Sequence, residues 1–251
     1  MIVKAYAKVN FILNVLGTRP DGYHEIETVF QAINLYDTVR VTPGPYRELP
    51  FGRENLAYKA LRLMKDYYGH PFEDYCIEIE KRIPEAAGLA GGSADGAAVM
   101  TALAGLWGIP VDDKMYELAA ELGSDVPFCL AAQNGFPAAI ARGRGEKLEY
   151  IAPTDCAVEL KLSEIRLANK TARVYGALEP EDYAKPFDLA AFASAETAAE
   201  KAACMGNHLQ PALERLTGIS EPGWLLCGAG PTYFRVWPKD KAPEGAIPTV
   251  L

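Results

Sequence analysis

A glycine-rich segment that runs directly into an apolar helix constrains the fold of this chain more than any other feature. The segment, from Pro84 to Gly108, reads PEAAGLAGGSADGAAVMTALAGLWG. Ser93 is a favourable N-cap residue, and Asp95 suits the positive end of a helix dipole. Residues 97–107 are apolar on nearly every side, and such a helix is stable only when other elements cover it. The chain must therefore fold in layers around this helix.

Strand and helix patterns alternate along the rest of the chain. In residues 2–15 the odd positions are apolar and most even positions are polar, which predicts a strand with Lys8 and Asn10 on one face. Alternating elements of both kinds predict an α+β sandwich of the split βαβ kind, with a boundary near residues 153 and 154. Further strands are predicted at 25–33, 38–42, 76–83, 136–142, 146–151, 156–162, 224–228 and 232–237, and helices at 55–69, 112–123, 171–178 and 197–216.

Charge and cysteine usage exclude several classes of function. The 33 acidic and 25 basic residues give a net charge of −8, which repels nucleic acids and anionic membranes. No signal peptide or membrane span is predicted. The 5 cysteines are odd in number and include no C-x-x-C pair, so they indicate reduced thiols in a cytoplasmic protein. The 3 scattered histidines predict no metal site.

The loop Gly88-Leu89-Ala90-Gly91-Gly92-Ser93 has the chemistry of an anion site. Glycines allow close backbone approach, and the N–H groups at the start of the following helix favour a phosphate. The spacing matches neither a dinucleotide-binding loop nor a Walker loop. A tight strand-to-helix turn that binds nothing is the alternative.

Two charged residues stand out against apolar surroundings. Asp125 lies between a helix end and a proline, and residues 126–141 carry no charge. It is either a capping or salt-bridged structural residue or a general base. Lys8 lies among apolar neighbours on its strand, which indicates that its face is partly covered. Ser93 lacks the G-x-S-x-G context of a hydrolase nucleophile, although composition alone does not exclude a Ser/His/Asp site.

Several segments of the sequence resemble those of a known family. PEAAGLAGGSADGAA resembles the phosphate loop of the GHMP kinases, small-molecule kinases named for galactokinase and for homoserine, mevalonate and phosphomevalonate kinases. AYAKVNFILNVLGTRPDGYHEIETVFQAINLYD resembles the opening of a member that acts on 4-diphosphocytidyl-2-C-methyl-D-erythritol. ENLAYKALRLM, LGSDVPF, NHLQPAL and CGAGPTYF resemble its later segments in the same order, so the resemblance covers most of residues 1–237.

The resemblance implies a two-domain α+β fold. Residues 1–153 would form an ATP-binding catalytic domain with a mixed sheet and helices, of a type also found in a ribosomal protein. Residues 154–251 would form an abridged ferredoxin-like substrate domain. The implied reaction is ATP-dependent phosphorylation of the tertiary 2-hydroxyl of the methylerythritol moiety, with Mg²⁺ bridging the phosphates, in non-mevalonate isoprenoid biosynthesis.

The resemblance also implies a role for particular residues. Asp125 would take the hydroxyl proton, while Lys8 would orient Asp125 and stabilise charge on the reacting oxygens. Asn10 would help to hold the substrate. Tyr23 and Tyr175 would stack on the cytosine from opposite domains, and His24 would hydrogen-bond to it. The residues expected around the ATP phosphates are Pro84, Gly88, Leu89, Ala90, Gly91, Gly92 and Ser93.

The chain departs from the family pattern at three places, one of which is residues 160–170, where LKLSEIRLANK replaces the usual H-P-G segment. Ala94 and Gly96 stand where other members often carry Ser and Ala, which leaves Ser93 as the only hydroxyl of the loop. After Trp237 a short tail replaces the expected helix and closing strand, which predicts a partly covered apolar face and a homodimer. The alternatives to this substrate are a kinase of another small alcohol, which has no need of the DGYHEIET segment, and a catalytically silent nucleotide-binding relative.

Overall fold

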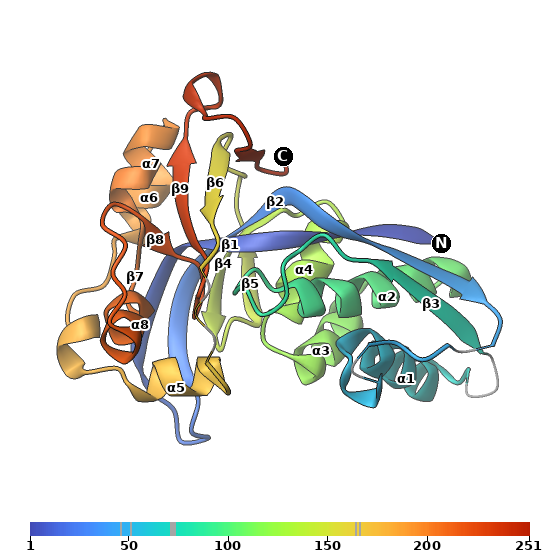
Figure 1. The fold of residues 1–251 in the computed structure, drawn as a ribbon. Helices are drawn as coiled ribbons and strands as arrows, with labels where there is room; N and C mark the ends of the chain where they lie inside the picture. Colours follow the sequence, from blue (N-terminus) through green and yellow to red (C-terminus); the bar gives the residue numbers. More distant parts are fainter. Residues whose placement is uncertain (46, 51, 71–73, 164, 166) are drawn as a thin grey trace. The chain divides into compact units, whose positions relative to one another are not determined.

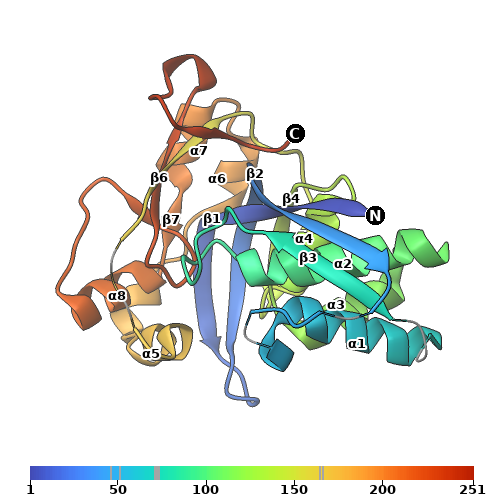
Figure 2. The ribbon, with the colours of Figure 1, turned by 45° about the vertical axis from the view of Figure 1, so that its right-hand side comes forward.

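A computed structural model describes residues 1–45, 47–50, 52–70, 74–163, 165 and 167–251 (Figures 1 and 2). Its helices and mixed or antiparallel sheets confirm the α+β class. The strands are β1 (Ile2–Thr18), β2 (His24–Pro43), β3 (Tyr75–Glu80), β4 (Ala138–Gly143), β5 (Lys147–Tyr150), β6 (Ala157–Lys161), β7 (Gly206–Asn207), β8 (Leu225–Leu226), β9 (Tyr233–Trp237) and β10 (Ile247–Pro248). The helices are α1 (Leu56–Tyr68), α2 (Gly91–Trp107), α3 (Asp113–Leu122), α4 (Val126–Gln133), α5 (Lys170–Gly176), α6 (Leu189–Ser194), α7 (Ala198–Cys204) and α8 (Leu209–Thr217). Short 3-10 turns lie at Gly52–Glu54, Pro180–Tyr183 and Lys239–Lys241.

The strands form two sheets. One has the order β5-β4-β2-β1-β7, with β3 also paired to β2, and the other has the order β10-β6-β9-β8. The segments predicted at 25–33 and 38–42 belong to one long strand, β2. Of the helices in the described ranges, none is long and apolar enough to cross a membrane.

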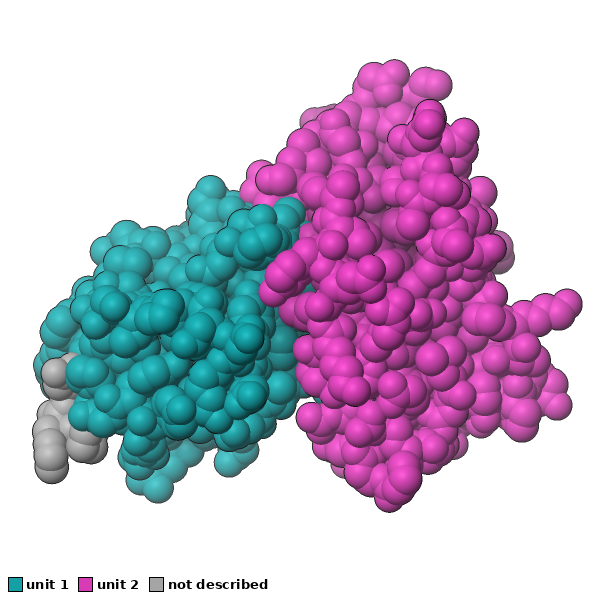
Figure 3. Space-filling view, turned by 180° about the vertical axis from the view of Figure 1, so that it is seen from behind, with its two compact units in different colours: residues 1–7, 35–85, 90–137 teal, residues 8–34, 86–89, 138–251 magenta. Residues whose placement is uncertain are grey.

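The chain divides into two compact units, coloured separately in Figure 3. Unit 1 comprises residues 1–7, 35–85 and 90–137, and unit 2 comprises residues 8–34, 86–89 and 138–251. The family-type boundary at residues 153 and 154 stays a prediction.

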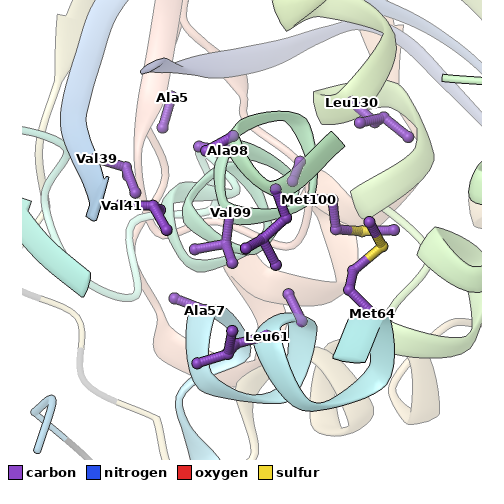
Figure 4. Close-up of a cluster of buried hydrophobic side chains, with 14 of the residues drawn as sticks. Ala5, Val39, Val41, Ala57, Leu61, Met64, Ala98, Val99, Met100 and Leu130 are labelled. Atoms are coloured by element: carbon purple, nitrogen blue, oxygen red, sulfur yellow. The ribbon is translucent and has the colours of Figure 1, made fainter. Parts of the chain in front are cut away.

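The core of unit 1 surrounds α2, as the apolar segment predicts (Figure 4). Asn55 caps α1 by accepting the N–H of Ala57 at 2.9 Å, and Gly69 ends the helix with φ 77°. Met64 of α1 and Met100 of α2 are both fully buried in this core. The local capping signals and the tertiary packing therefore agree at α1.

Two expectations about unit 1 are wrong. Ser93 is not the N-cap of α2: the helix begins at Gly91, and its N-cap is Ala90 in the left-handed conformation, with φ 61°. The second error is α4, which lies in a stretch for which no helix is predicted. Its 8 residues are mostly buried and apolar all round, so the sequence offers no periodicity to distinguish it from a buried strand.

The helix predicted over 197–216 in unit 2 is also wrong. The segment forms α7 and α8, separated by β7, in which Gly206 pairs in parallel with Ile12 of β1. A Cβ atom at Gly206 would lie 2.1 Å from the ring of Phe187, so the backbone passes too close for a side chain. The neighbouring helix α6 is not predicted either. These contacts with distant residues replace the continuous helix.

The C-terminal residues complete the edge of the second sheet. β10 pairs antiparallel with β6, with Ile247 opposite Val158. The Thr249 hydroxyl donates to the carbonyl of Thr154 at 2.7 Å. The expectation that the tail after Trp237 lacks a closing strand is therefore wrong, because β10 supplies a short strand at this edge.

Candidate functional site

Lys8 lies in unit 2, where its ammonium donates hydrogen bonds to an amide oxygen and a carbonyl oxygen. Its Nζ donates to Oδ1 of Asn10 at 2.8 Å and to the Gly88 carbonyl at 3.5 Å, and the residue is only 3% exposed. Asn10 in turn donates to the Thr28 hydroxyl at 2.8 Å. The face of β1 that carries Lys8 and Asn10 is therefore covered, as the apolar neighbours of Lys8 indicate. This chain of hydrogen bonds fixes the position of a positive charge.

The first part of the glycine-rich loop is bound to the same strand. The Lys8 N–H donates to the Leu89 carbonyl at 3.1 Å. Gly88 has φ 84°, and a Cβ there would lie 2.5 Å from the Cys227 carbonyl oxygen and 2.7 Å from that of Gly230. Only glycine fits this position, so the loop is locked against the turn that joins β8 and β9.

The second part of the loop belongs to unit 1 and forms the first turn of α2. Gly91 and Gly92 are helical, and Ser93 is half-buried. A Cβ at Gly91 would lie 3.0 Å from Cγ2 of Ile83, whereas a Cβ at Gly92 would meet only Cδ1 of Leu56, at 3.9 Å. Packing therefore accounts for Gly91, while Gly92 leaves open space beside the N–H groups of the helix start.

Pro84 precedes this loop in unit 1 and is half-buried. Asp125, also in unit 1, is the N-cap residue of α4, yet its side chain makes no capping hydrogen bond to the helix. A capping role therefore does not explain this carboxylate. The prediction of Asp125 as a general base remains open to test.

A buried charged cluster in unit 1 has no counterpart in the sequence-based predictions. The Lys81 Nζ donates to carboxylate oxygens of Asp37 at 2.5 Å and of Asp95 at 2.8 Å. Burial raises the pKa of Asp95 to about 7, although Lys81 opposes the shift. Burial disfavours the charged form of Lys81, but the two carboxylates outweigh it and raise the pKa of Lys81. Oδ1 of Asp95 has no hydrogen-bond partner among the described residues.

The residues expected to bind cytosine, Tyr23, His24 and Tyr175, all lie in unit 2. The rings of His24 and Tyr175 are in contact, with centroids 4.9 Å apart. Tyr23 is 54% exposed, and the guanidinium of Arg144 lies 4.7 Å from its ring centroid. Arg144, which the sequence does not single out, therefore covers Tyr23.

A second cation contacts the loop of unit 2 and is likewise absent from the sequence-based predictions. Lys170, the first residue of α5, donates from Nζ to the carbonyl oxygens of Ala86 and Gly230. Burial lowers the pKa of Lys170 to about 8, and Lys8 contributes to the shift. A single lysine at the start of a helix has no distinguishing pattern, so no sequence signal marks it.

Comparison with known proteins adds independent information. The family model of the GHMP kinases N terminal domain matches residues 55–133. The curated 4-diphosphocytidyl-2-C-methyl-D-erythritol kinase of Pelotomaculum thermopropionicum is 39% identical over 254 residues, covering 92% of this chain and 86% of the relative. The corresponding protein of Exiguobacterium sibiricum is 36% identical, covering 93% of this chain and 88% of the relative.

A solved structure is similar over nearly the whole chain. The crystal structure of a 4-(cytidine 5'-diphospho)-2C-methyl-D-erythritol kinase has a TM-score of 0.77 and 36% identity, covering 93% of this chain and 89% of the other. A mevalonate kinase structure, at 13% identity, has a TM-score of 0.70 and covers 94% and 91% of the two chains. At that identity the second likeness concerns the fold alone.

Proposed function

This chain belongs to the 4-diphosphocytidyl-2-C-methyl-D-erythritol kinases, a branch of the GHMP kinases, and from this premise we propose how its residues perform the reaction. The protein is a small-molecule kinase that transfers the terminal phosphoryl group of ATP to the 2-hydroxyl of 4-diphosphocytidyl-2-C-methyl-D-erythritol in isoprenoid biosynthesis. The observation that best supports a phosphoryl-transfer site is the buried ammonium of Lys8, which is 3% exposed and held by Asn10. Fixed positive charge is what such a reaction needs.

In the transfer step the substrate hydroxyl oxygen forms a bond to the terminal phosphorus, and the bond from phosphorus to the leaving oxygen of ADP breaks. We assign Asp125 as the base that accepts the hydroxyl proton. Lys8 stabilises the negative charge that spreads over the reacting oxygens and orients the base. Asn10 keeps Lys8 in place and contributes to holding the substrate.

The glycine-rich loop is assigned to the ATP phosphates. The N–H groups of Gly91, Gly92 and Ser93 lie in the first turn of α2, where backbone donors have no partner within the helix. The open space beside Gly92 supports this assignment. Pro84, Gly88, Leu89 and Ala90 shape the approach to that turn.

Mg²⁺ is proposed as the companion of ATP. Among the described residues, no group of three His, Cys, Asp or Glu side chains is placed to hold a metal ion. A Mg²⁺ ion bound mainly by nucleotide phosphates and water fits these residues, because it takes few ligands from the protein. Ser93 is the residue that we propose to contact it. When bound, the ion neutralises charge on the phosphates.

The cytosine of the acceptor is assigned to His24 and Tyr175. Tyr175 provides a flat aromatic face, and His24 provides hydrogen-bonding nitrogens. Tyr23 supplies a second aromatic face in the same unit, with Arg144 over it. Base stacking with hydrogen bonds to the base edge is the usual way in which proteins select a base.

The deciding experiment measures ADP formation with ATP and four acceptors: the cytidyl substrate, its uridyl analogue, mevalonate and homoserine. The proposal predicts turnover with the cytidyl substrate and at least tenfold lower kcat/KM with the uridyl analogue, since unpaired buried groups cost about 1–3 kcal/mol each. Turnover with mevalonate or homoserine alone would contradict the cytidyl substrate and leave only the assignment to the GHMP kinases. ATP binding without any turnover would identify a catalytically silent relative.

Two further proposals concern the state of the protein. A homodimer is proposed because large apolar side chains of unit 2 are exposed, among them Leu162 at 57%. Sedimentation from micromolar to hundred-micromolar concentration tests it, and a monomer throughout contradicts it. The cytoplasm is proposed as its location because all five cysteines are free thiols.

A further inference from the structure

Lys170 and Lys8 bring two ammonium groups to the same pair of glycine turns in unit 2. The Lys170 Nζ donates to the Ala86 carbonyl at 2.7 Å and to the Gly230 carbonyl. The Lys8 Nζ donates to the carbonyl of Gly88, two residues further along the first turn. A Cβ at Gly228, in the second turn, would lie 3.5 Å from the Lys8 Nζ. Both cations therefore border residues 86–88 and 228–230.

The charge of Lys170 is poorly compensated. Its recorded hydrogen-bond partners are neutral carbonyl oxygens, and it forms no ion pair within the described ranges of the chain. Burial lowers its pKa to about 8, and repulsion by Lys8 adds to the shift while the Cys227 thiol opposes it. A partly buried ammonium in this situation is stabilised by any anion that reaches it.

The position of Lys170 on α5 relates it to the nucleobase residues. Tyr175 lies five residues later in the same helix, a rise of about 7.5 Å at 1.5 Å per residue. Tyr175 contacts His24, while the other end of α5 reaches the loop beside Lys8. Because Lys170 and Lys8 border the same two turns, a ligand that extends from Tyr175 toward Lys8 approaches the N-terminal end of α5, where Lys170 lies.

We propose that Lys170 is a binding residue for the diphosphate of the cytidine-diphosphate-linked acceptor, through contact of its ammonium with a phosphate oxygen. This inference rests on the proposed function, because it requires the base at Tyr175. The diphosphate joins the cytidine to the methylerythritol moiety, so it occupies the middle of the molecule. Lys170 is the residue of α5 whose ammonium lies at the turns that Lys8 also borders.

The alternative is that Lys170 only clamps the loop through the Ala86 and Gly230 carbonyls. Lys170→Gln separates the two roles because the amide still donates hydrogen bonds but carries no charge. Lys147→Gln is the matched control, since Lys147 is an exposed lysine on β5 of the same unit. Lys170→Arg keeps the positive charge and serves as the conservative variant.

The experiment measures dissociation constants of cytidine 5'-diphosphate and of cytidine by calorimetry for the wild type and the three variants. A charge-assisted hydrogen bond contributes about 1.5–3 kcal/mol, so Lys170→Gln should reduce the preference for the diphosphate roughly tenfold or more. The affinity for cytidine should stay within about twofold, because stacking on Tyr175 is untouched. Lys170→Arg should retain most of the preference, and Lys147→Gln all of it.

Two results would overturn the inference. An unchanged preference in Lys170→Gln means that the ammonium does not contact the diphosphate. An equal loss of affinity for both ligands means that Lys170 acts only as a clamp. If the wild type phosphorylates the cytidyl substrate and either result is found, the proposed function stands without this residue. If the wild type binds neither ligand and has no turnover, the proposed function itself fails.

Discussion

The rings of His24 and Tyr175 lie with centroids 4.9 Å apart and planes 34° from parallel. His24 begins β2 and Tyr175 lies near the end of α5, so unit 2 joins two distant parts of the sequence at this point. Burial lowers the pKa of His24, which keeps the imidazole neutral near pH 7. A neutral imidazole has one donor and one acceptor nitrogen, so the pair offers both a stacking face and a means of reading a base edge.

Substitutions of this pair should have different effects on base selection. Tyr175→Ala should weaken binding of the cytidyl and uridyl acceptors alike, by about 1–3 kcal/mol, because stacking tolerates any base. His24→Ala should instead narrow the gap between their kcat/KM values, because hydrogen bonds to the base edge carry the selection. Tyr150→Ala, at an exposed tyrosine of unit 2, is the control. If His24→Ala leaves the ratio of the two kcat/KM values unchanged, His24 does not select the base.

Asp125→Asn should lower kcat by about 10²- to 10⁴-fold, because the amide keeps the size of the side chain but does not accept the hydroxyl proton. ATP affinity should change little. Steady-state kinetics and nucleotide calorimetry on the same preparation check both statements. Asp113→Asn, at an exposed aspartate of α3, controls for the loss of one negative charge. Retention of most activity in Asp125→Asn would exclude it as the base.

The two halves of the glycine-rich loop should respond differently to added side chains. Gly88→Ala should destabilise the protein by about 1–3 kcal/mol, because the conformation is left-handed and strained for alanine. The new Cβ would also lie 2.5 Å from the Cys227 carbonyl oxygen. Gly92→Val has open space and helical backbone, so its melting temperature should stay near that of the wild type while ATP binding weakens. Unchanged ATP affinity in Gly92→Val would make the loop a purely structural turn.

The buried carboxyl of Asp95 should make stability depend on pH. Its pKa is about 7 in the folded chain, against an ordinary value of 3.8. Between these values the folded state holds a proton that the unfolded state has lost, so this contribution to stability falls as pH rises and levels off above about pH 7. Asp95→Asn removes the charge, and its melting temperature relative to the wild type should therefore increase from about pH 5 to about pH 8. Calorimetric scans at a series of pH values measure the difference in melting temperature between Asp95→Asn and the wild type. A difference that stays constant with pH would contradict the prediction.

Local signals in the sequence predict part of the fold well. Asn55, Gly69 and Asp112 each stand where a cap is needed, and the structure confirms helices bounded by them. These local signals fail where tertiary contacts determine the secondary structure. Gly206 interrupts a helical pattern only because the backbone there passes against the ring of Phe187. No pattern of nearby residues records that contact.

The residues of the candidate site likewise fall into those that local patterns predict and those that only the fold brings together. The Gly-rich loop and the Lys8–Asn10 pair are found from residue types at short spacing, and the structure adds a hydrogen bond between the two residues of the pair. Lys170 and Arg144 come from segments with no distinguishing composition. They are found only because the fold places Lys170 against Gly230 and Arg144 against Tyr23. Contacts across long stretches of chain have no local signature.

The interleaving of the two units along the chain has a consequence for synthesis on the ribosome. All residues of unit 1 have been made once residue 137 is added, whereas unit 2 still lacks residues 138–251 at that moment. Chains fold from the N-terminus as they emerge. Unit 1 can therefore become compact while translation continues, but residues 8–34 of β1 and β2 must wait for partners such as β4 and β7. During that interval the long edges of these strands are exposed, and exposed edges favour pairing with other chains.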